Sequence, residues 1–414
     1  MPKIIFRPTP IPRPPFPPPT PVTGPLTFTA KQNGCRIGYI YFSEDYEVQD
    51  AGLNIEYSID GGQTWNPYSM STTESGAQMI SLNNGETVMF RGNNANLAYY
   101  LDDEDDYQAT KFVIEGQMAA SGDVSSLLNG IGGVLTTPIY CYAYMFDSCT
   151  SLTQAPVLPA TTLANDCYYN MFNGCTSLTQ APVLPATMLA NFCYAAMFND
   201  CTSLTQAPAL PAITLADSCY SNMFNGCTSL TQAPALPATT LAVHCYAFMF
   251  NGCTSLTQAP ALPATTLANY CYTYMFLGCT SLTQAPVLPA TTLVNECYSN
   301  MFDSCTSLTQ APALPAITLA DSCYSNMFNG CTSLTQAPAL PATTLANYCY
   351  AAMFNGCTSL SHIEALFTTT PGTNYTNNWV KGVAQNGTFV KSSEATWAVT
   401  GVNGIPEGWT VTTK

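Results

Sequence analysis

The sequence predicts a repeat solenoid of nine coils, preceded by an all-β domain and closed by a small β cap. The first observation is a period of 26 residues, which relates two series of nine cysteines that begin at Cys141 and Cys149. A fixed period of this length is typical of solenoids, in which each repeat is one supersecondary unit. The second is that 47% of the residues are hydrophobic and only 8% are charged. Each repeat therefore carries an apolar stripe that only a neighbouring repeat can bury.

The sequence of one repeat predicts a short helix, then a short parallel strand, and then a proline-rich segment that leads to the next repeat. Cys167 and Met171 are four residues apart, and Tyr168 and Phe172 form a neighbouring row with the same spacing. This pattern predicts an amphipathic helix of two to three turns. The following CTSLTQA predicts a strand with Leu178 directed inward, ended by a proline that cannot donate a ladder hydrogen bond.

The repeat cysteines are predicted to be free, buried thiols that act as small hydrophobic side chains. Equivalent cysteines of stacked coils have parallel Cβ directions, which fits disulfide geometry poorly, and nine per series cannot pair completely. Zinc would require paired cysteines or histidines, and the chain has only His244 and His362. Disulfides or a metal are the alternatives; we expect neither a metal nor a cofactor. The core ladders include Cys167, Cys193 and Cys219 in one series and Cys175, Cys201 and Cys227 in the other.

Residues 1–25 predict an extended proline-rich arm, because they include eleven prolines. Lys3, Arg7 and Arg13 give the arm a positive charge, whereas the whole chain has a net charge of −15. The arm is either a spacer or an anchor that binds a partner protein, and composition does not separate the two.

Residues 26–120 predict a small β-sandwich-like domain. Alternating segments flank a turn at Gly61-Gly62, and Asn84-Gly85 predicts a second hairpin, because both of its residues tolerate positive φ. The segment SIDGGQTW resembles the Asp-box motif of sialidases. We interpret its Asp60 as a residue that stabilises a turn, and a glycosidase built on it is a distant alternative.

Two further segments lie outside the nine copies. The acidic run 102–106 predicts a solvated loop, with Ca²⁺ binding as the alternative. The solenoid spans residues 121–366, and residues 367–414 predict a β cap, in which GTFV, ATWAV and GWTV are short strands. A terminal cap is what an open-ended stack of repeats requires.

Charge and composition exclude several classes of function. No Lys or Arg occurs between Lys111 and Lys381, so the repeats lack the cations that bind nucleic acid. No apolar segment is long enough for a transmembrane helix, so membrane insertion is not expected. The N-terminus lacks the apolar core of a secretory signal, which leaves cytoplasmic folding or earlier removal of a signal. No catalytic constellation occurs, and nine similar repeats do not bring unlike groups together once, as an active site requires.

The copies differ mainly at two pairs of residues around each Cys-Tyr. On the predicted helix these pairs are exposed, and several are aromatic or Asn, which are residue types that anchor ligands. Neutral drift after duplication accounts for this variation slightly better, because solvent-facing substitutions cost little, and binding of a sugar or a protein partner is the other interpretation. The candidate surface comprises Tyr169, Asn170, Phe192, His244, Phe248, Tyr270, Tyr274 and Tyr348.

The signature MFxGCTSLTxxPxLPATTLAxxCY resembles the BspA-like leucine-rich repeats, whose pattern has the shape AFxxCxxLTxIxIPxxVxxI. The pair Ala181-Pro182 departs from this pattern, in which an aliphatic residue is usual. The resemblance covers all nine copies and implies a leucine-rich-repeat fold and a surface protein that acts in adhesion or protein binding. The flanking segments resemble modules of Bacteroides proteins and of their phages. The matching positions in one copy are Phe172, Cys175, Leu178, Thr179, Leu184, Pro185 and Leu189.

Together these features predict a non-enzymatic structural and binding protein, namely a phage virion fibre or decoration protein. Its arm would bind other virion or surface proteins, and its solenoid would bind a host surface protein or glycan. Fibres are commonly symmetric, so a homo-oligomer is possible. The alternative is a BspA-like adhesin on the bacterial cell surface.

Overall fold

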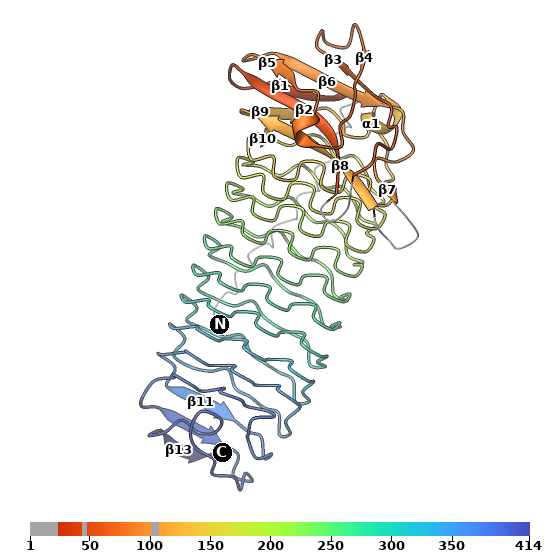
Figure 1. Cartoon of the computed structure of the whole chain (residues 1–414). Helices are drawn as coiled ribbons and strands as arrows, with labels where there is room; N and C mark the ends of the chain where they lie inside the picture. Colours follow the sequence, from red (N-terminus) through yellow and green to blue (C-terminus); the bar gives the residue numbers. More distant parts are fainter. Residues whose placement is uncertain (1–23, 44–47, 101–106) are drawn as a thin grey trace, which may run out of the picture.

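The computed structural model describes residues 24–43, 48–100 and 107–414. A strand-rich segment lies at one end, the coils stack from it in one direction, and a small parallel sheet lies at the other end (Figure 1). The acidic run 102–106 and the proline-rich arm, apart from Gly24 and Pro25, lie outside the described residues.

The regular elements of the N-terminal segment are mostly strands. Its two short helices are the 3₁₀ helix η1 (Glu74–Gly76) and α1 (Ser126–Asn129). The strands are β1 (Leu26–Ala30), β2 (Cys35–Phe42), β3 (Ile55–Ser58), β4 (Asn66–Pro67), β5 (Ile80–Leu82), β6 (Thr87–Gly92), β7 (Tyr99–Tyr100), β8 (Tyr107–Glu115) and β9 (Met118–Ser121).

These strands form two sheets, with the orders β10-β9-β1-β6-β3-β4 and β5-β2-β8-β7. The expected hairpin at Gly61-Gly62 is confirmed, since β3 pairs with β4. The hairpin expected at Asn84-Gly85 is wrong: β5 pairs with β2 and β6 with β1, so this turn connects the two sheets. Gly85 has a φ of 83°, as expected for a turn residue, but a local turn does not decide which strands pair.

The N-terminal segment and the solenoid share one continuous core. The strand β10 (Leu152–Gln154) belongs to the first repeat and pairs in parallel with β9. The ring of Phe112 stacks on that of Phe146 at 5.4 Å, and Phe146 begins a row of stacked phenylalanines along the solenoid. The buried Lys111 Nζ lies 3.2 Å from an Asp147 carboxylate oxygen across the junction. The strands therefore cover the first coil as a lid.

The helix predicted in each coil is wrong, because a series of overlapping β-turns takes its place. We number the coils by their first-series cysteine, so that coil 1 contains Cys141 and coil 9 contains Cys349, and each coil begins two residues before that cysteine. In coil 2, the N–H groups of Tyr169 and Met171 donate to carbonyls three residues back, at 3.1 and 3.2 Å. The N–H groups that alternate with these, of Tyr168 and Asn170, donate instead to carbonyls of coil 3, and the same alternation recurs in the later coils.

This backbone has a clear physical signature in the left-handed residues. Positive φ recurs every fourth residue, with 55° at Asp166, 52° at Asn170 and 69° at Gly174. A type II turn requires positive φ at its third residue, which Asn and Gly tolerate. An α-helix would use nearly every N–H within its own coil, whereas these turns release every second N–H to bind the next coil. The stacking of coils therefore replaces intrahelical hydrogen bonding.

The apolar stripe predicted for the helix is nevertheless the inward face of the turn series. Cys167, Tyr168, Met171 and Phe172 are all buried, and the inward direction of Leu178 is confirmed. The tyrosine rings of successive coils stack at 5.4–6.1 Å, from Tyr142 to Tyr350. After coil 1, most of the predicted strands are reduced to single parallel bridges between neighbouring coils, for example at Gln180.

The C-terminal segment continues the solenoid in parallel register. β11 (His362–Ala365), β12 (Thr388–Lys391) and β13 (Thr410–Thr413) form a three-stranded parallel sheet. The expected strands in GTFV and GWTV are present, whereas ATWAV forms no named strand. Four large rings close the core at this end, since Phe367, Trp379, Phe389 and Trp397 are buried against one another.

Candidate binding surface of the solenoid

The variable residues form two parallel rows on the turns, which we call the turn face. One row consists of the residue directly before each first-series cysteine. The other row consists of the residue three positions after that cysteine. In coils 2–9 every member of both rows is left-handed, with φ between 49° and 60°. The rows are Asp166, Phe192, Ser218, His244, Tyr270, Glu296, Ser322 and Tyr348, and Asn170, Ala196, Asn222, Phe248, Tyr274, Asn300, Asn326 and Ala352.

Four of the predicted residues form an aromatic quartet where the solenoid passes through coils 5 and 6. His244 stacks on Tyr270 with ring centroids 4.6 Å apart and planes 6° apart. Phe248 stacks on Tyr274 at 4.5 Å and 11°. All four rings are half-buried. Because the facing surfaces of each pair cover one another, a ligand can reach only the outer face of each ring, the ring edges, the imidazole nitrogens and the phenol hydroxyls.

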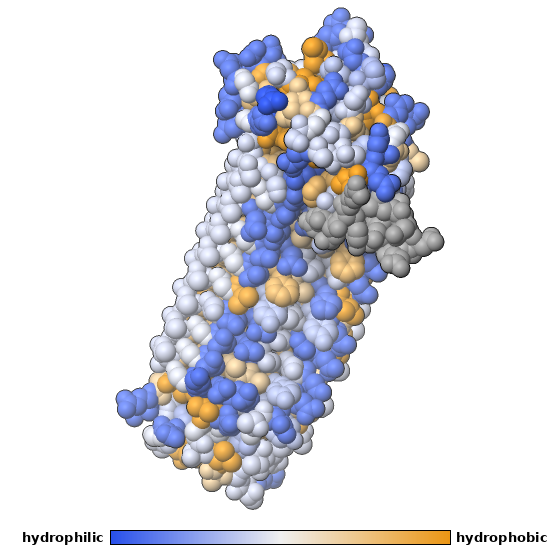
Figure 2. Space-filling model, in the orientation of Figure 1, coloured by the Kyte–Doolittle hydropathy of each residue, from blue (hydrophilic) through white to orange (hydrophobic). Residues whose placement is uncertain are grey.

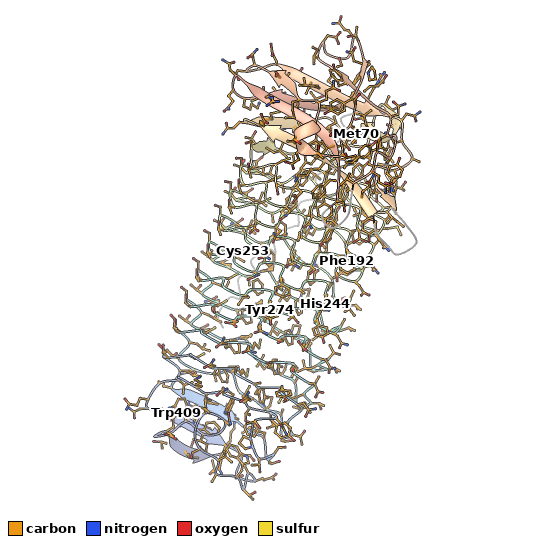
Figure 3. All side chains as sticks on the ribbon, in the orientation of Figure 1. Met70, Phe192, His244, Cys253, Tyr274 and Trp409 are labelled. Carbon is orange, nitrogen blue, oxygen red and sulfur yellow. The ribbon has the colours of Figure 1, made fainter. Side chains whose placement is uncertain are left out.

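The other predicted residues occupy different environments. Phe192 and Tyr348 belong to the same row as His244, and their side chains are 43% and 50% exposed. Phe192 and His244 lie along one side of the solenoid, with Tyr274 beside them (Figure 3), on a surface where hydrophilic rows alternate with apolar side chains (Figure 2). Tyr169 is separate from this surface, because its ring packs edge-on against Tyr144 at 5.5 Å near the N-terminal strands.

The two predicted cysteine series lie inside the solenoid, and all eighteen of their cysteines, like Cys35 of β2, are buried and free. The second series has a role that the sequence did not indicate, because each thiol donates to the carbonyl of a phenylalanine 29 residues earlier in coils 2–9. Cys253 Sγ, for example, lies 3.1 Å from Phe224 O. Burial raises the pKa of Cys167 and of Cys219 to about 12, which suppresses the reactive thiolate.

The turn face has an acidic character. No Lys or Arg occurs between Lys111 and Lys381, whereas Asp166 and Glu296 lie in the same row as the quartet's His244. Partial burial raises the pKa of Asp166 to about 6, and a hydrogen bond from Tyr140 offsets part of that shift. Asp166 therefore exchanges its proton near neutral pH.

The expected turn role of Asp60 is confirmed. Its carboxylate accepts hydrogen bonds from the backbone N–H groups of Gln63 and Thr64, both at 3.0 Å, and from the Thr64 hydroxyl at 2.6 Å. These bonds hold the pKa of Asp60 well below its usual range. All hydrogen-bond partners of the Asp60 carboxylate belong to one turn, as expected for a structural Asp box.

A second surface was not singled out from the sequence. The segment TSLTQAP is identical in coils 1–8 although its Thr and Gln are exposed, and this constancy was the available signal. We call the exposed Thr-Gln pairs of coils 2–8 the Thr–Gln face; they are Thr179-Gln180, Thr205-Gln206, Thr231-Gln232, Thr257-Gln258, Thr283-Gln284, Thr309-Gln310 and Thr335-Gln336.

The described part of the chain contains no group of three or more His, Cys, Asp or Glu residues placed to hold a metal ion. Among these residues there is also no helix with the length and apolar character needed to cross a bilayer. The described residues form a stack of similar coils with two patterned outer surfaces, the turn face and the Thr–Gln face. This arrangement defines a solenoid repeat protein.

Comparison with known families agrees with this class. A family model described as the BspA type leucine rich repeat region matches residues 136–257 and 250–376, with six copies. The matched residues make up more than half of the chain, which therefore belongs to the BspA-type leucine-rich-repeat proteins. This membership indicates a surface or binding protein. No curated protein matches the chain, and the likeness of the flanking segments to Bacteroides and phage modules stays a prediction.

Proposed function

We propose that the protein is a non-enzymatic attachment protein whose turn face binds a protein on a host surface, with the aromatic quartet at the centre of the contact. The observation that carries this proposal is the left-handed conformation of four bulky rings. Left-handed φ is unfavourable for aromatic residues, and such strain is of the order of 1–3 kcal/mol for each residue. Asn170, Asn222 and Asn300 occupy equivalent positions without a ring, so the fold does not require aromatics there.

The stacking geometry favours a protein over a sugar as the ligand of this surface. A sugar ring packs on an open aromatic face, but the facing surfaces of His244 and Tyr270, and of Phe248 and Tyr274, are covered by one another. Ring edges carry partial positive charge and pack against the faces of other aromatic side chains. Aromatic anchors are also the side chains that dominate protein interfaces.

The proposal extends to where the protein is displayed. We favour a virion fibre or decoration protein, attached through the proline-rich arm, over the alternative of a bacterial cell-surface adhesin. The nineteen free, buried thiols support folding in a reducing compartment, such as the cytoplasm in which virions assemble. Mass spectrometry and imaging of purified particles test this part: the chain found only on cell envelopes would overturn it in favour of the adhesin.

The binding test replaces the quartet by the residue that other coils use. We combine His244→Asn, Phe248→Asn, Tyr270→Asn and Tyr274→Asn, and measure binding of fluorescent full-length protein to bacterial cells by flow cytometry. Wild type is expected to label a subset of cells, and protease treatment of those cells is expected to abolish labelling. The variant should lose labelling by at least about ten-fold.

The matched control is Ser322→Asn with Asn326→Ser, which alters the same two rows elsewhere. It should label cells as wild type does. Equal labelling by the quartet variant, or labelling that survives protease treatment, would contradict the proposed protein-binding role of the quartet.

A further inference from the structure

The Thr–Gln face combines exposure with a constancy that the fold does not explain. The Gln side chains of coils 2–8 make no hydrogen bond within the described part of the chain, and all seven are exposed. Of the Thr hydroxyls of this face, only those of Thr205, Thr231 and Thr309 bond to the previous coil within the described residues, and these bonds are long, at 3.3–3.4 Å. Solvent-facing substitutions at such positions change stability little.

Recent copying alone does not account for this constancy. The same coils differ from one another at the turn face, where Asn222, Phe248 and Tyr274 occupy one row in three successive coils. Copies that have diverged at one exposed surface have had the opportunity to diverge at another. The Thr–Gln face is therefore retained for a reason other than folding or lack of time.

The same surface is hollowed in a repeating way. A cavity of about 400 Å³ lies between coils 4 and 5 and is lined by Thr231–Ala233 and Thr257–Pro260. A second cavity of about 530 Å³ lies between coils 7 and 8 and is lined by the equivalent residues Thr309–Ala311 and Thr335–Pro338. Beside the first is an apolar hollow of about 260 Å³, lined by Ala, Pro and Leu of the same two coils. Equivalent hollows thus occur at two coil junctions, and at the first of them an apolar floor lies beside the Thr-Gln pairs.

We infer that the Thr–Gln face binds a neutral, linear polysaccharide laid along the solenoid axis. Identical exposed Thr-Gln pairs on successive coils match a polymer of identical units, whereas a polypeptide would present a different side chain to each coil. A Gln amide both donates and accepts hydrogen bonds, as a sugar hydroxyl does. The cavity linings contain no charged residue, so an ionic polymer has no partner there.

Repetition also determines how the affinity depends on ligand length. Each subsite supplies few hydrogen bonds, and each bond contributes modestly, so single subsites bind weakly. A polymer that reaches several coils gains the later subsites at high effective concentration. Binding is therefore expected to increase steeply with chain length and to change little with salt.

The test is affinity electrophoresis of the full-length protein in gels that contain dextran, amylose, linear mannan, a linear β-glucan or linear galactan, with heparin as the charged polymer. At least one neutral polysaccharide is expected to retard the protein, at low and high salt alike, and heparin is not. Gln232→Ala, Gln258→Ala, Gln284→Ala and Gln310→Ala together should weaken that binding by about 100-fold or more, because four subsites each lose an amide. The quartet variant of the turn face is the matched control and should be retarded as wild type is.

The outcomes separate this inference from the proposed attachment through the turn face. Loss of retardation in the quartet variant but not in the Gln variant would place the glycan on the turn face and overturn the inference. Retardation by heparin alone would also overturn the inference, and so would retardation by no polysaccharide. Binding of a proline-rich peptide but of no glycan would overturn it as well. Circular dichroism and thermal unfolding of the Gln variant, which loses no internal hydrogen bond, are expected to match wild type.

Discussion

The turn face and the Thr–Gln face lie on the same coils, yet they have opposite relations between sequence and structure. The turn face has a backbone that strongly restricts its residues, since every member of its two rows is left-handed, but its side chains vary from coil to coil. The Thr–Gln face is identical in sequence through coils 2–8, although its exposed Gln side chains have no hydrogen-bond partner among the residues that the structure describes. Backbone constraint and sequence constancy are thus separate properties, and only the second is left unexplained by folding.

The largest expected effect on stability comes from a substitution in the core, and it contrasts the core with the Thr–Gln face. Phe250→Ala removes one ring from the stacked phenylalanine row, where Phe250 lies 5.7 Å from Phe224 and 5.6 Å from Phe276. We expect a loss of about 3–5 kcal/mol in the free energy of unfolding, because the cavity is enclosed. The measurement is urea unfolding followed by circular dichroism.

The control for this prediction is Gln258→Ala in the same coil, which should change the free energy of unfolding by less than about 0.5 kcal/mol. A destabilisation by Gln258→Ala comparable to that of Phe250→Ala would mean that the Thr–Gln face is retained for stability, and the contrast between the two faces would disappear.

The second effect concerns the hydrogen bond that a second-series cysteine donates to the previous coil. Cys253→Ala removes the S–H donor that binds Phe224 O and also leaves a small void, so a loss of about 1–2 kcal/mol is expected. Cys245→Ala, in the other series of the same coil, should destabilise less, because within the described residues its thiol does not donate to a carbonyl as that of Cys253 does. Urea midpoints compare the two; equal losses would show that only volume matters.

A thiol assay accompanies that comparison. In the native protein the thiols should react with Ellman's reagent only on unfolding, because all nineteen cysteines are buried and free. Unfolding in denaturant should then expose all nineteen. Rapid reaction of the folded protein would contradict the buried ladders.

The third effect is pH-dependent and tests the turn face directly. The pKa of Asp166 is about 6 in the folded protein, above the ordinary value of 3.8 for an aspartate, so the folded state binds its proton more tightly than the unfolded state does. The stability this contributes is complete below about pH 4 and is lost as the pH rises through 6. Allowing for the partial exposure of the carboxylate, we expect Asp166→Asn to be about 1 kcal/mol more stable than wild type at pH 8.

This stability difference should vanish at pH 4, because wild-type Asp166 is then protonated in the folded state. Thermal unfolding of both proteins across this range provides the measurement. A constant difference between the two at all pH values would mean that burial of the charge is not its cause.

The smallest effect measures the strain of an aromatic residue on the turn face. Phe192 has a φ of 55° and stacks on no other described ring, so Phe192→Asn should stabilise the protein by about 0.5–1 kcal/mol. Tyr270→Asn relieves the same strain but loses the stack on His244, so its effect should be close to zero. If both variants were destabilising, the rings would stabilise the coil and the argument from strain would fail.

The expectation of a helix failed for a definable reason. Cys167, Met171 and Cys175 recur every four residues, and over so short a segment this spacing cannot be distinguished from the 3.6-residue period of a helix. The distinguishing signal was present at other positions, since Asp166, Asn170 and Gly174 are residue types that accept left-handed φ. The Asn84-Gly85 hairpin failed similarly, because the turn residues were identified correctly but the strand partners were not.

The sequence by itself determined the period, the set of inward-facing residues and the family, because all three depend on the order and polarity of side chains along one chain. The tertiary structure alone decided the backbone between those residues. Every second N–H of each turn series bonds to the next coil, so the local conformation is stable only when a neighbour supplies the carbonyl. The same stacking placed four aromatic residues from two coils into paired rings. It also aligned the Thr-Gln pairs into a continuous surface, because residues 26 apart become neighbours only when the coils pack.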